Sequence, residues 1–264
     1  MDLATTATTT VPEISVSNAL PAASKVSLVS TEIGGGYTLI GRSSIAINYS
    51  FKAKVELANL AYAKKVWLHY TRMGSTVWQD AAFVYSSTTA AGNEIWNLTL
   101  NGGTSNSEKV DQYVIKYEVN GQTYWDNNNG TNYRVDQTQA GLPGYYQFYL
   151  RNDLNVLLNS QVIGTSVSND KFVNFGILIK NLAYNKMVSI LYSTDKWKTN
   201  KTANFNFIGS YPNGFEIWGD GGSFNLLSNV GTPGTRTFDY AIVYKVNGQE
   251  YWDNNFGKNY SFVY

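Results

Sequence analysis

Residues 117–133 read YEVNGQTYWDNNNGTNY, and residues 244–260 read YKVNGQEYWDNNFGKNY. In both stretches a run of alternating residues reaches an Asn-Gly pair, and a short second run follows. Asn-Gly between two alternating runs is the strongest short-range signal for a β-hairpin, because both central residues of a type I′ turn need positive φ. The sequence therefore predicts the same hairpin at two places in the chain.

Two further blocks recur in the same order, which identifies the chain as a tandem repeat. Residues 58–66 (ANLAYAKKV) return as residues 180–188 (KNLAYNKMV), and the Glu-Ile-Trp of residues 94–96 returns at 216–218. Each unit is about 115 residues long, close to the size of a typical domain and long enough to bury a core.

Composition indicates where the segments begin and end. Residues 1–24 are rich in Thr, Ala and Ser and predict a disordered tail. We expect the first module at residues 25–137 and the second at residues 147–264. A short Gly/Pro-containing connector at residues 138–146 would join them as close neighbours.

The hydrophobic pattern within each unit has a period of two. Phe51, Ala53, Val55 and Leu57 alternate with charged residues, which is typical of a half-buried strand. The second unit repeats this pattern with Val173, Phe175, Ile177 and Ile179. No segment has a helical period of sufficient length. Several short strands separated by turns predict an all-β fold, an antiparallel β-sandwich, in each unit.

Composition excludes several classes of function. The 264 residues include 20 Lys and Arg against 19 Asp and Glu, one His and no Cys, for a net charge of +1. A charge this near zero gives no attraction to phosphate backbones or anionic lipids, so we expect no nucleic acid and no membrane partner. With His69 alone and no Cys, we also expect no metal and no cofactor. Aromatic residues at 15% and charged residues at 15% favour a large, neutral, polar ligand.

Targeting signals are not visible. The segment from Met1 to Thr6 has neither a basic region nor an apolar core of a signal peptide. No run of about 18 apolar residues is present to span a membrane. The absence of Cys fits either the cytosol or a secreted fragment whose signal was removed.

An enzymatic reading starts from carboxylates that recur as a pair: Glu94 with Asp126, and Glu216 with Asp253. Most glycosidases use a pair of carboxylic acid side chains as their catalytic groups. However, Glu94 lies in a strand, and Asp126 opens a turn, where Asp commonly binds its own backbone. His69 has Leu191 as its counterpart, so we expect a structural or surface role for it. We expect the chain not to be an enzyme.

The residues that follow the hairpin favour carbohydrate binding. Trp125 and Trp252 offer flat indole faces, and a run of Asn residues follows each. An Asn amide presents both a donor and an acceptor, as a sugar hydroxyl does. The alternative interpretation is a turn of residues that tolerate positive φ, with the Trp in the core. The repetition of the motif in the second unit favours a binding role.

A second pair of tryptophans lies in polar surroundings. Trp78 and Trp197 each follow a strand by a few polar residues, so we expect both to be partly exposed. Trp96 and Trp218 lie in alternating strands and are expected in the core. Each unit then has two rings that could stack on a chain of sugars.

At these residues the sequence resembles family 21 carbohydrate-binding modules, the starch- and glycogen-binding domains of fungal glucoamylases and of glycogen-targeting phosphatase subunits. The family is marked by an N-[IVL]-x-[YF]-x-K-x-V block, found at residues 59–66 and 181–188, and by a VNGxxYWDNNxGxNY block, found at residues 119–133 and 246–260. The resemblance covers each unit of about 115 residues. It implies two immunoglobulin-like antiparallel β-sandwich domains in tandem that bind α-1,4-glucan without cleaving it.

The resemblance also implies the site residues. The main site comprises Trp78, Trp125, Asn127, Asn129 and Asn132 in the first module, and Trp197, Trp252, Asn254 and Asn259 in the second. A second site comprises Asn59, Tyr62 and Lys64 in the first module, and Asn181, Tyr184, Lys186 and Phe215 in the second. The chain departs from the family in several places: Val114 and Ala241 replace an aromatic residue of the strand before the hairpin, Asn93 stands where the second module has Phe215, and Phe256 replaces Asn129.

The residues themselves support binding of a neutral polysaccharide. The resemblance narrows this ligand to starch, amylose, maltooligosaccharides or glycogen, bound bivalently through the two modules. It implies an attached amylase or glucoamylase domain, with the chain an extracellular fragment. One alternative is a cytoplasmic glycogen-targeting scaffold for a phosphatase, for which Lys171–Phe175 (KFVNF) fits a basic-x-Val-x-Phe docking pattern. Another is a lectin-like module for a different neutral glycan.

Overall fold

The computed structural model describes residues 20–21, 23–40, 44–102, 105–136, 145–165, 171–220, 224–227 and 237–263. Nearly all of the expected tail at 1–24 and most of the expected connector at 138–146 lie outside these ranges. The described residues form antiparallel sheets and two short 3-10 turns, η1 (Asn106–Glu108) and η2 (Pro212–Gly214). Among them, no helix has the length and apolar character that crossing a membrane requires. The predicted all-β class is confirmed.

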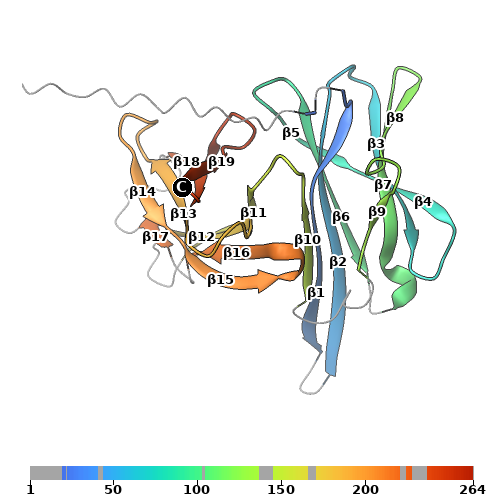
Figure 1. The fold of residues 1–264 in the computed structure, drawn as a ribbon, viewed down its shortest axis with the longest axis horizontal. Helices are drawn as coiled ribbons and strands as arrows, with labels where there is room; N and C mark the ends of the chain where they lie inside the picture. Colours follow the sequence, from blue (N-terminus) through green and yellow to red (C-terminus); the bar gives the residue numbers. More distant parts are fainter. Residues whose placement is uncertain are drawn as a thin grey trace, which may run out of the picture. The chain divides into compact units, whose positions relative to one another are not determined.

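The first module consists of two sheets (Figure 1). One has the strand order β10 (Tyr146–Leu150), β1 (Val26–Ile40), β2 (Ser44–Leu57), β6 (Glu94–Gly102) and β5 (Val84–Thr88). The other has the order β4 (Trp78–Ala82), β3 (Lys64–Arg72), β7 (Val110–Val119) and β8 (Gln122–Asp126), and β9 (Tyr133–Arg134) also pairs with β7.

The second module repeats this arrangement. Its first sheet has the order β11 (Val156–Thr165), β12 (Lys171–Lys180), β16 (Phe215–Gly219) and β15 (Asn206–Tyr211), and β17 (Phe224–Leu227) also pairs with β12. Its second sheet has the order β14 (Lys201–Asn204), β13 (Lys186–Ser193), β18 (Thr237–Val246) and β19 (Gln249–Asp253), and β20 (Tyr260–Val263) also pairs with β18.

The two predicted hairpins are present. β7 and β8 meet at Asn120 and Gly121, with φ values of 52° and 71°. β18 and β19 meet at Asn247 and Gly248, with φ values of 51° and 73°. The positive φ at both central positions is what an Asn-Gly turn provides.

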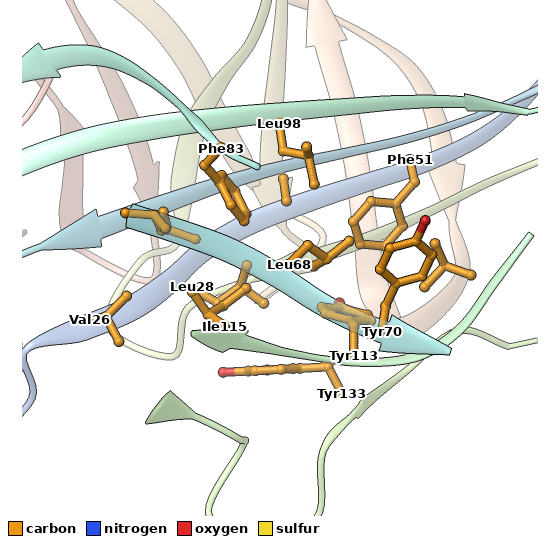
Figure 2. Close-up of a cluster of buried hydrophobic side chains, with 14 of the residues drawn as sticks. Val26, Leu28, Phe51, Leu68, Tyr70, Phe83, Leu98, Tyr113, Ile115 and Tyr133 are labelled. Carbon is orange, nitrogen blue, oxygen red and sulfur yellow. The ribbon is translucent and has the colours of Figure 1, made fainter. Parts of the chain in front are cut away.

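The core of the first module lies between its two sheets. Figure 2 shows Phe51 and Leu28 facing Leu68, Tyr113 and Ile115. The predicted inward residues of β2, including Phe51, are at most 4% exposed. The second module has its own cluster, in which Ile177 on β12 and Ile242 on β18 are fully buried. Trp96 and Trp218 pack against these clusters but are only partly buried.

Strand β10 belongs to the first module, and the described strands of the second module include no counterpart of it. It pairs with β1, from Ser30 opposite Leu150 to Gly34 opposite Tyr146. One compact unit comprises Ala19–Asp153 with Tyr211–Asn213, and the other contains Leu154–Ser210 and Gly214–Tyr264. β10 lies in the first module because it pairs with the edge strand β1. The chain enters the second module only after this strand.

A buried ion pair holds the end of this added strand in the first module. The Arg151 Nη1 donates to Glu56 Oε2 at 2.9 Å, and the two side chains are 6% and 1% exposed. The carboxylate of Glu56 also accepts from Asn93 Nδ2 at 2.9 Å. Glu56 was expected on the polar face of its strand, and its burial is explained by a guanidinium that lies far away in the sequence.

Candidate carbohydrate-binding surface

Three rings lie together on the outer face of the second sheet of the first module. His69 on β3 stacks on Trp78, the first residue of β4, with centroids 4.7 Å apart and planes 10° apart. The same imidazole makes a T-shaped contact with Trp125 on β8, with ring centroids 5.6 Å apart and an angle of 69° between the planes. Trp125 is 47% exposed, and Trp78 and His69 are half-buried. The surface therefore offers a ring platform that crosses the four strands β4, β3, β7 and β8, with rings from three of them.

Charged groups beside this platform are paired with one another. Asp80 binds His69 Nδ1 and lies 3.6 Å from Lys116 Nζ. Lys116 Nζ lies 2.8 Å from Glu118 Oε1 and 5.9 Å above the ring of Trp125. The hydrogen bond from Lys116 lowers the pKa of Glu118, and the same bond raises the pKa of Lys116. Each of these charged groups therefore has a partner of opposite charge or a hydrogen bond within the protein.

The Asn residues after β8 divide between loop structure and free amides. Asn127 Oδ1 accepts from the amide of Gly130 at 3.0 Å, so its Nδ2 remains available. Asn128, with φ of 52°, donates to the carbonyl of Asn132. Asn132 Nδ2 donates to Gln112 Oε1 at 3.3 Å. The exposed Asn129 side chain makes no hydrogen bond to the described residues. Asn128 and Asn132 therefore stabilise the turn, whereas Asn127 and Asn129 present amide groups at the surface.

Asp126 and its counterpart Asp253 anchor the loops. Asp126 Oδ2 accepts the amide of Leu28 at 2.6 Å, next to a register shift in β1, and both oxygens accept the hydroxyl of Tyr133 at 3.0 Å. Asp253 is buried and accepts the amide of Leu158 at 2.6 Å. Burial, followed by the charge of Asp126, raises the pKa of Tyr133. Both carboxylates therefore hold neighbouring segments of the chain together through hydrogen bonds.

The other members of the carboxylate pairs are also engaged. Glu94 Oε2 accepts the indole Nε1 of Trp96 at 2.9 Å, and Glu216 accepts from Trp218 at 2.8 Å. Within the described ranges, no group of three or more His, Asp or Glu side chains is arranged to hold a metal ion.

The main site of the second module is built differently. Trp252 on β19 is half-buried, but Trp197 lies in the loop before β14 rather than on a strand. Leu191 takes the strand position of His69. Asn254 is 5% exposed and its Oδ1 accepts the amide of Gly257, so its role is largely within the loop. Asn259 is half-buried, with φ of 57°.

The loop that carries Trp197 is held by Asp195. The Trp197 backbone has φ of 64°, a conformation that costs free energy for a bulky residue. Its amide donates to Ser193 Oγ at 2.8 Å, and Ser193 Oγ donates to Asp195. Asp195 accepts both the amide and the hydroxyl of Thr199. These bonds, led by the Thr199 amide, lower the pKa of Asp195 to about 2.

The residues expected at a second site form the same cluster in both modules. Lys64 Nζ binds Asn59 Oδ1 and lies 2.8 Å from Glu94 Oε1. Lys186 Nζ likewise binds Asn181 and lies 2.8 Å from Glu216 Oε1. Both Lys side chains are only 3% exposed. Their ammonium groups therefore brace the loop between two strands instead of facing solvent.

The aromatic residues of the second site differ in exposure. Tyr62 and Tyr184 are 102% and 96% exposed, which leaves both ring faces free. Phe215 is 7% exposed, so it cannot offer a ring face to a ligand as expected. Two further rings, Tyr85 and Phe207, were not predicted; they are about half exposed and contact Trp96 and Trp218 edge-on at 6.1 and 6.0 Å. Their recurrence at matching places on β5 and β15 was the available signal.

Residues 42–136 and 151–263 match the carbohydrate/starch-binding module (family 21). These two segments cover most of the chain, and one lies in each sandwich module, except that the second segment begins three residues before the second unit. The chain belongs to this family of non-catalytic carbohydrate-binding modules.

Relatives include enzymes and regulatory subunits. Glucoamylase 1 of Rhizopus oryzae is 36% identical over 97 residues, which are 34% of this chain and 15% of that protein. Glycogen-binding subunit 76A of Drosophila melanogaster is 28% identical over 126 residues, 48% of this chain and 17% of that protein. Human protein phosphatase 1 regulatory subunit 3B is 30% identical over 97 residues, 37% of this chain and 33% of that protein. The chain thus spans no more than a third of these relatives.

Among solved structures, the carbohydrate binding module of the muscle glycogen-targeting subunit of protein phosphatase-1 matches with 21% identity and a TM-score of 0.33. The match covers 41% of this chain and 75% of that one.

Proposed function

We propose that the chain binds α-1,4-glucan, as starch, amylose, maltooligosaccharides or glycogen, through one main site in each module. The observation that carries this proposal is the exposed Trp125 beside the stacked pair of His69 and Trp78. A flat, uncharged ring surface complements the C–H face of glucose, and Asn127 and Asn129 supply amides at its edge. In the second module the corresponding groups are Trp197, Trp252 and Asn259.

We place a second, smaller site around the exposed rings of Tyr62 in the first module and Tyr184 in the second. Tyr85 and Phe207 are further candidate rings, because each stands at the outer edge of the cluster that the buried lysines brace. Asn59 and Asn181 are exposed on the same loops, although each accepts a hydrogen bond from the neighbouring lysine.

The proposed role of this binding is to hold an attached amylolytic domain on its substrate outside the cell. The similarity to Glucoamylase 1 of Rhizopus oryzae supports it. The phosphatase scaffold in the cytoplasm is the alternative, supported by similarity to phosphatase regulatory subunits. The KFVNF pattern does not favour that alternative, since Val173 and Phe175 are buried in β12 and docking there would require unfolding of the strand.

The test is binding to maltoheptaose and to granular starch by Trp125→Ala, Trp252→Ala and the double variant. Loss of one stacking contact costs about 1 kcal/mol, or roughly a fivefold weaker Kd at the affected site, and the double variant should lose most retention on starch. Val162→Ala, which removes an exposed apolar side chain from β11, is the control and should bind normally. A double variant that melts like the parent and binds like it would refute the proposed sites.

A further inference from the structure

The main sites of the two modules differ at one strand position. His69 on β3 faces Val114 on β7 and Asp80 on β4. Leu191 on β13 occupies the corresponding place, facing Ala241 and Thr202. The strand register at this position is the same in the two modules, so here the difference lies in the side chain.

The imidazole of His69 joins two rings that come from different parts of the chain. It lies nearly parallel to Trp78 at 4.7 Å and at a steep angle to Trp125 at 5.6 Å. Asp80 binds its Nδ1, which sets the plane of the ring. The charged groups nearby, Lys116 and Glu118, form their own pair beside it. Trp78 is therefore held in place before any ligand arrives.

At the corresponding position of β13, the second module has no ring that could stack on a tryptophan. Leu191 is aliphatic and cannot make a parallel ring stack. Trp197 is also outside β14, in the loop held by Asp195, where its backbone has positive φ. Its ring depends on a loop for its position, whereas Trp78 depends on a strand and a stacked neighbour.

We infer that His69 is a positioning residue that preorganises the Trp78–Trp125 platform and thereby makes the main site of the first module the tighter of the two for α-glucan. Preorganised groups lose less conformational entropy on binding, so affinity rises without a new ligand contact. This inference rests on the proposed function and adds that the two main sites differ in their affinity for α-glucan.

The test isolates the main site of the first module in a full-length chain in which the other proposed rings are all replaced by alanine: Tyr62, Tyr85, Tyr184, Trp197, Phe207 and Trp252. In this background, His69→Leu should weaken maltoheptaose binding about fivefold by calorimetry, the equivalent of one aromatic pair. His69→Phe keeps a planar ring and should restore most of the affinity. Asp80→Asn, which keeps the ring but weakens its orientation, should fall between the parent and His69→Leu.

A spectroscopic readout separates positioning from mere structural support. His69 is the sole histidine of the chain, so its Cε1–H signal in NMR is unambiguous. Maltoheptaose should shift this signal in the isolating background, and Trp125→Ala should abolish the shift.

The outcomes distinguish this inference from the proposed function. If Trp125→Ala leaves affinity unchanged in the isolating background, the main site itself is misplaced. If Trp125→Ala weakens binding but His69→Leu and Asp80→Asn both bind like the parent, only the positioning role is overturned. The reciprocal Leu191→His, placed in a chain with Trp125→Ala, should gain no affinity because Trp197 is not in stacking register with it.

Discussion

Asp195 stabilises the conformation of the loop that precedes β14 and contains Trp197. Its two oxygens accept from Thr199 and Ser193, and these bonds fix the turn in which Trp197 adopts positive φ. Hydrogen bonds to the ionised form lower its pKa from 3.8 to about 2. The ionised carboxylate is therefore the form that the folded loop prefers, and the ring position of Trp197 depends on it.

The sign of the pH dependence follows from this lowered pKa. The loop contribution is complete above pH 3.8 and is lost as the pH falls through about 2. In a chain with Trp125→Ala, Asp195→Ala should weaken binding to granular starch severalfold at neutral pH, because Trp197 loses its support. Thr194→Ala, an exposed neighbour, is the matched control. Equal retention of both variants would show that the Trp197 loop has no part in binding.

At the level of elements, β10 shows how an edge strand is assigned to a module. Its residues Phe148 and Leu150 are buried, and the following Arg151 binds the buried carboxylate of Glu56. Removal of one partner of a buried ion pair leaves an uncompensated charge, which is costly. The pair therefore helps to keep the end of β10 on the first module.

Replacement of Arg151 tests this assignment. Arg151→Met should destabilise the first module by about 3–5 kcal/mol, since Glu56 would be left buried without its cation. The measurement is denaturant unfolding of the full chain, with hydrogen exchange of β1 and β10 as the local readout. Lys52→Met removes an exposed ion pair to Glu32 and should change stability by about 1 kcal/mol or less. Similar losses in both variants would contradict a special role for the buried pair.

At the level of the whole molecule, the proposed function predicts that duplication makes the chain a bivalent binder of glucan. Once one module is bound to a polymer, the second binds intramolecularly at an effective concentration of roughly millimolar. A free oligosaccharide occupies each site separately and gains nothing from the connection. The advantage is therefore specific to polymeric glucan.

Comparison of polymer and oligomer measures this advantage. On granular starch, Trp125→Ala and Trp252→Ala should each weaken binding of the whole chain about fivefold, because the bivalent affinity is proportional to the affinity of each site. On maltoheptaose, each variant should instead weaken only the affected site about fivefold and leave the other site unchanged. A single-site variant that is retained on starch as well as the parent would show that the modules act independently.

Much of the fold follows from local patterns. The alternation at Phe51 and Val55 and the Asn-Gly turns are properties of neighbouring residues, and both were confirmed. The candidate binding residues were predictable only in part. Trp125 and Tyr62 are exposed as expected, but Phe215 is buried, and Tyr85 was missed, because exposure depends on which strands pack beside a residue.

The sequence by itself determined the tandem repeat, the all-β class, the hairpins and the family, since repeated blocks and period-two patterns are readable from adjacent residues. Only the tertiary structure decided the place of β10, the burial of Glu56 and the stacking of His69 between Trp78 and Trp125. Each of these depends on cross-strand register between segments that are distant in the chain. No local pattern contains that register.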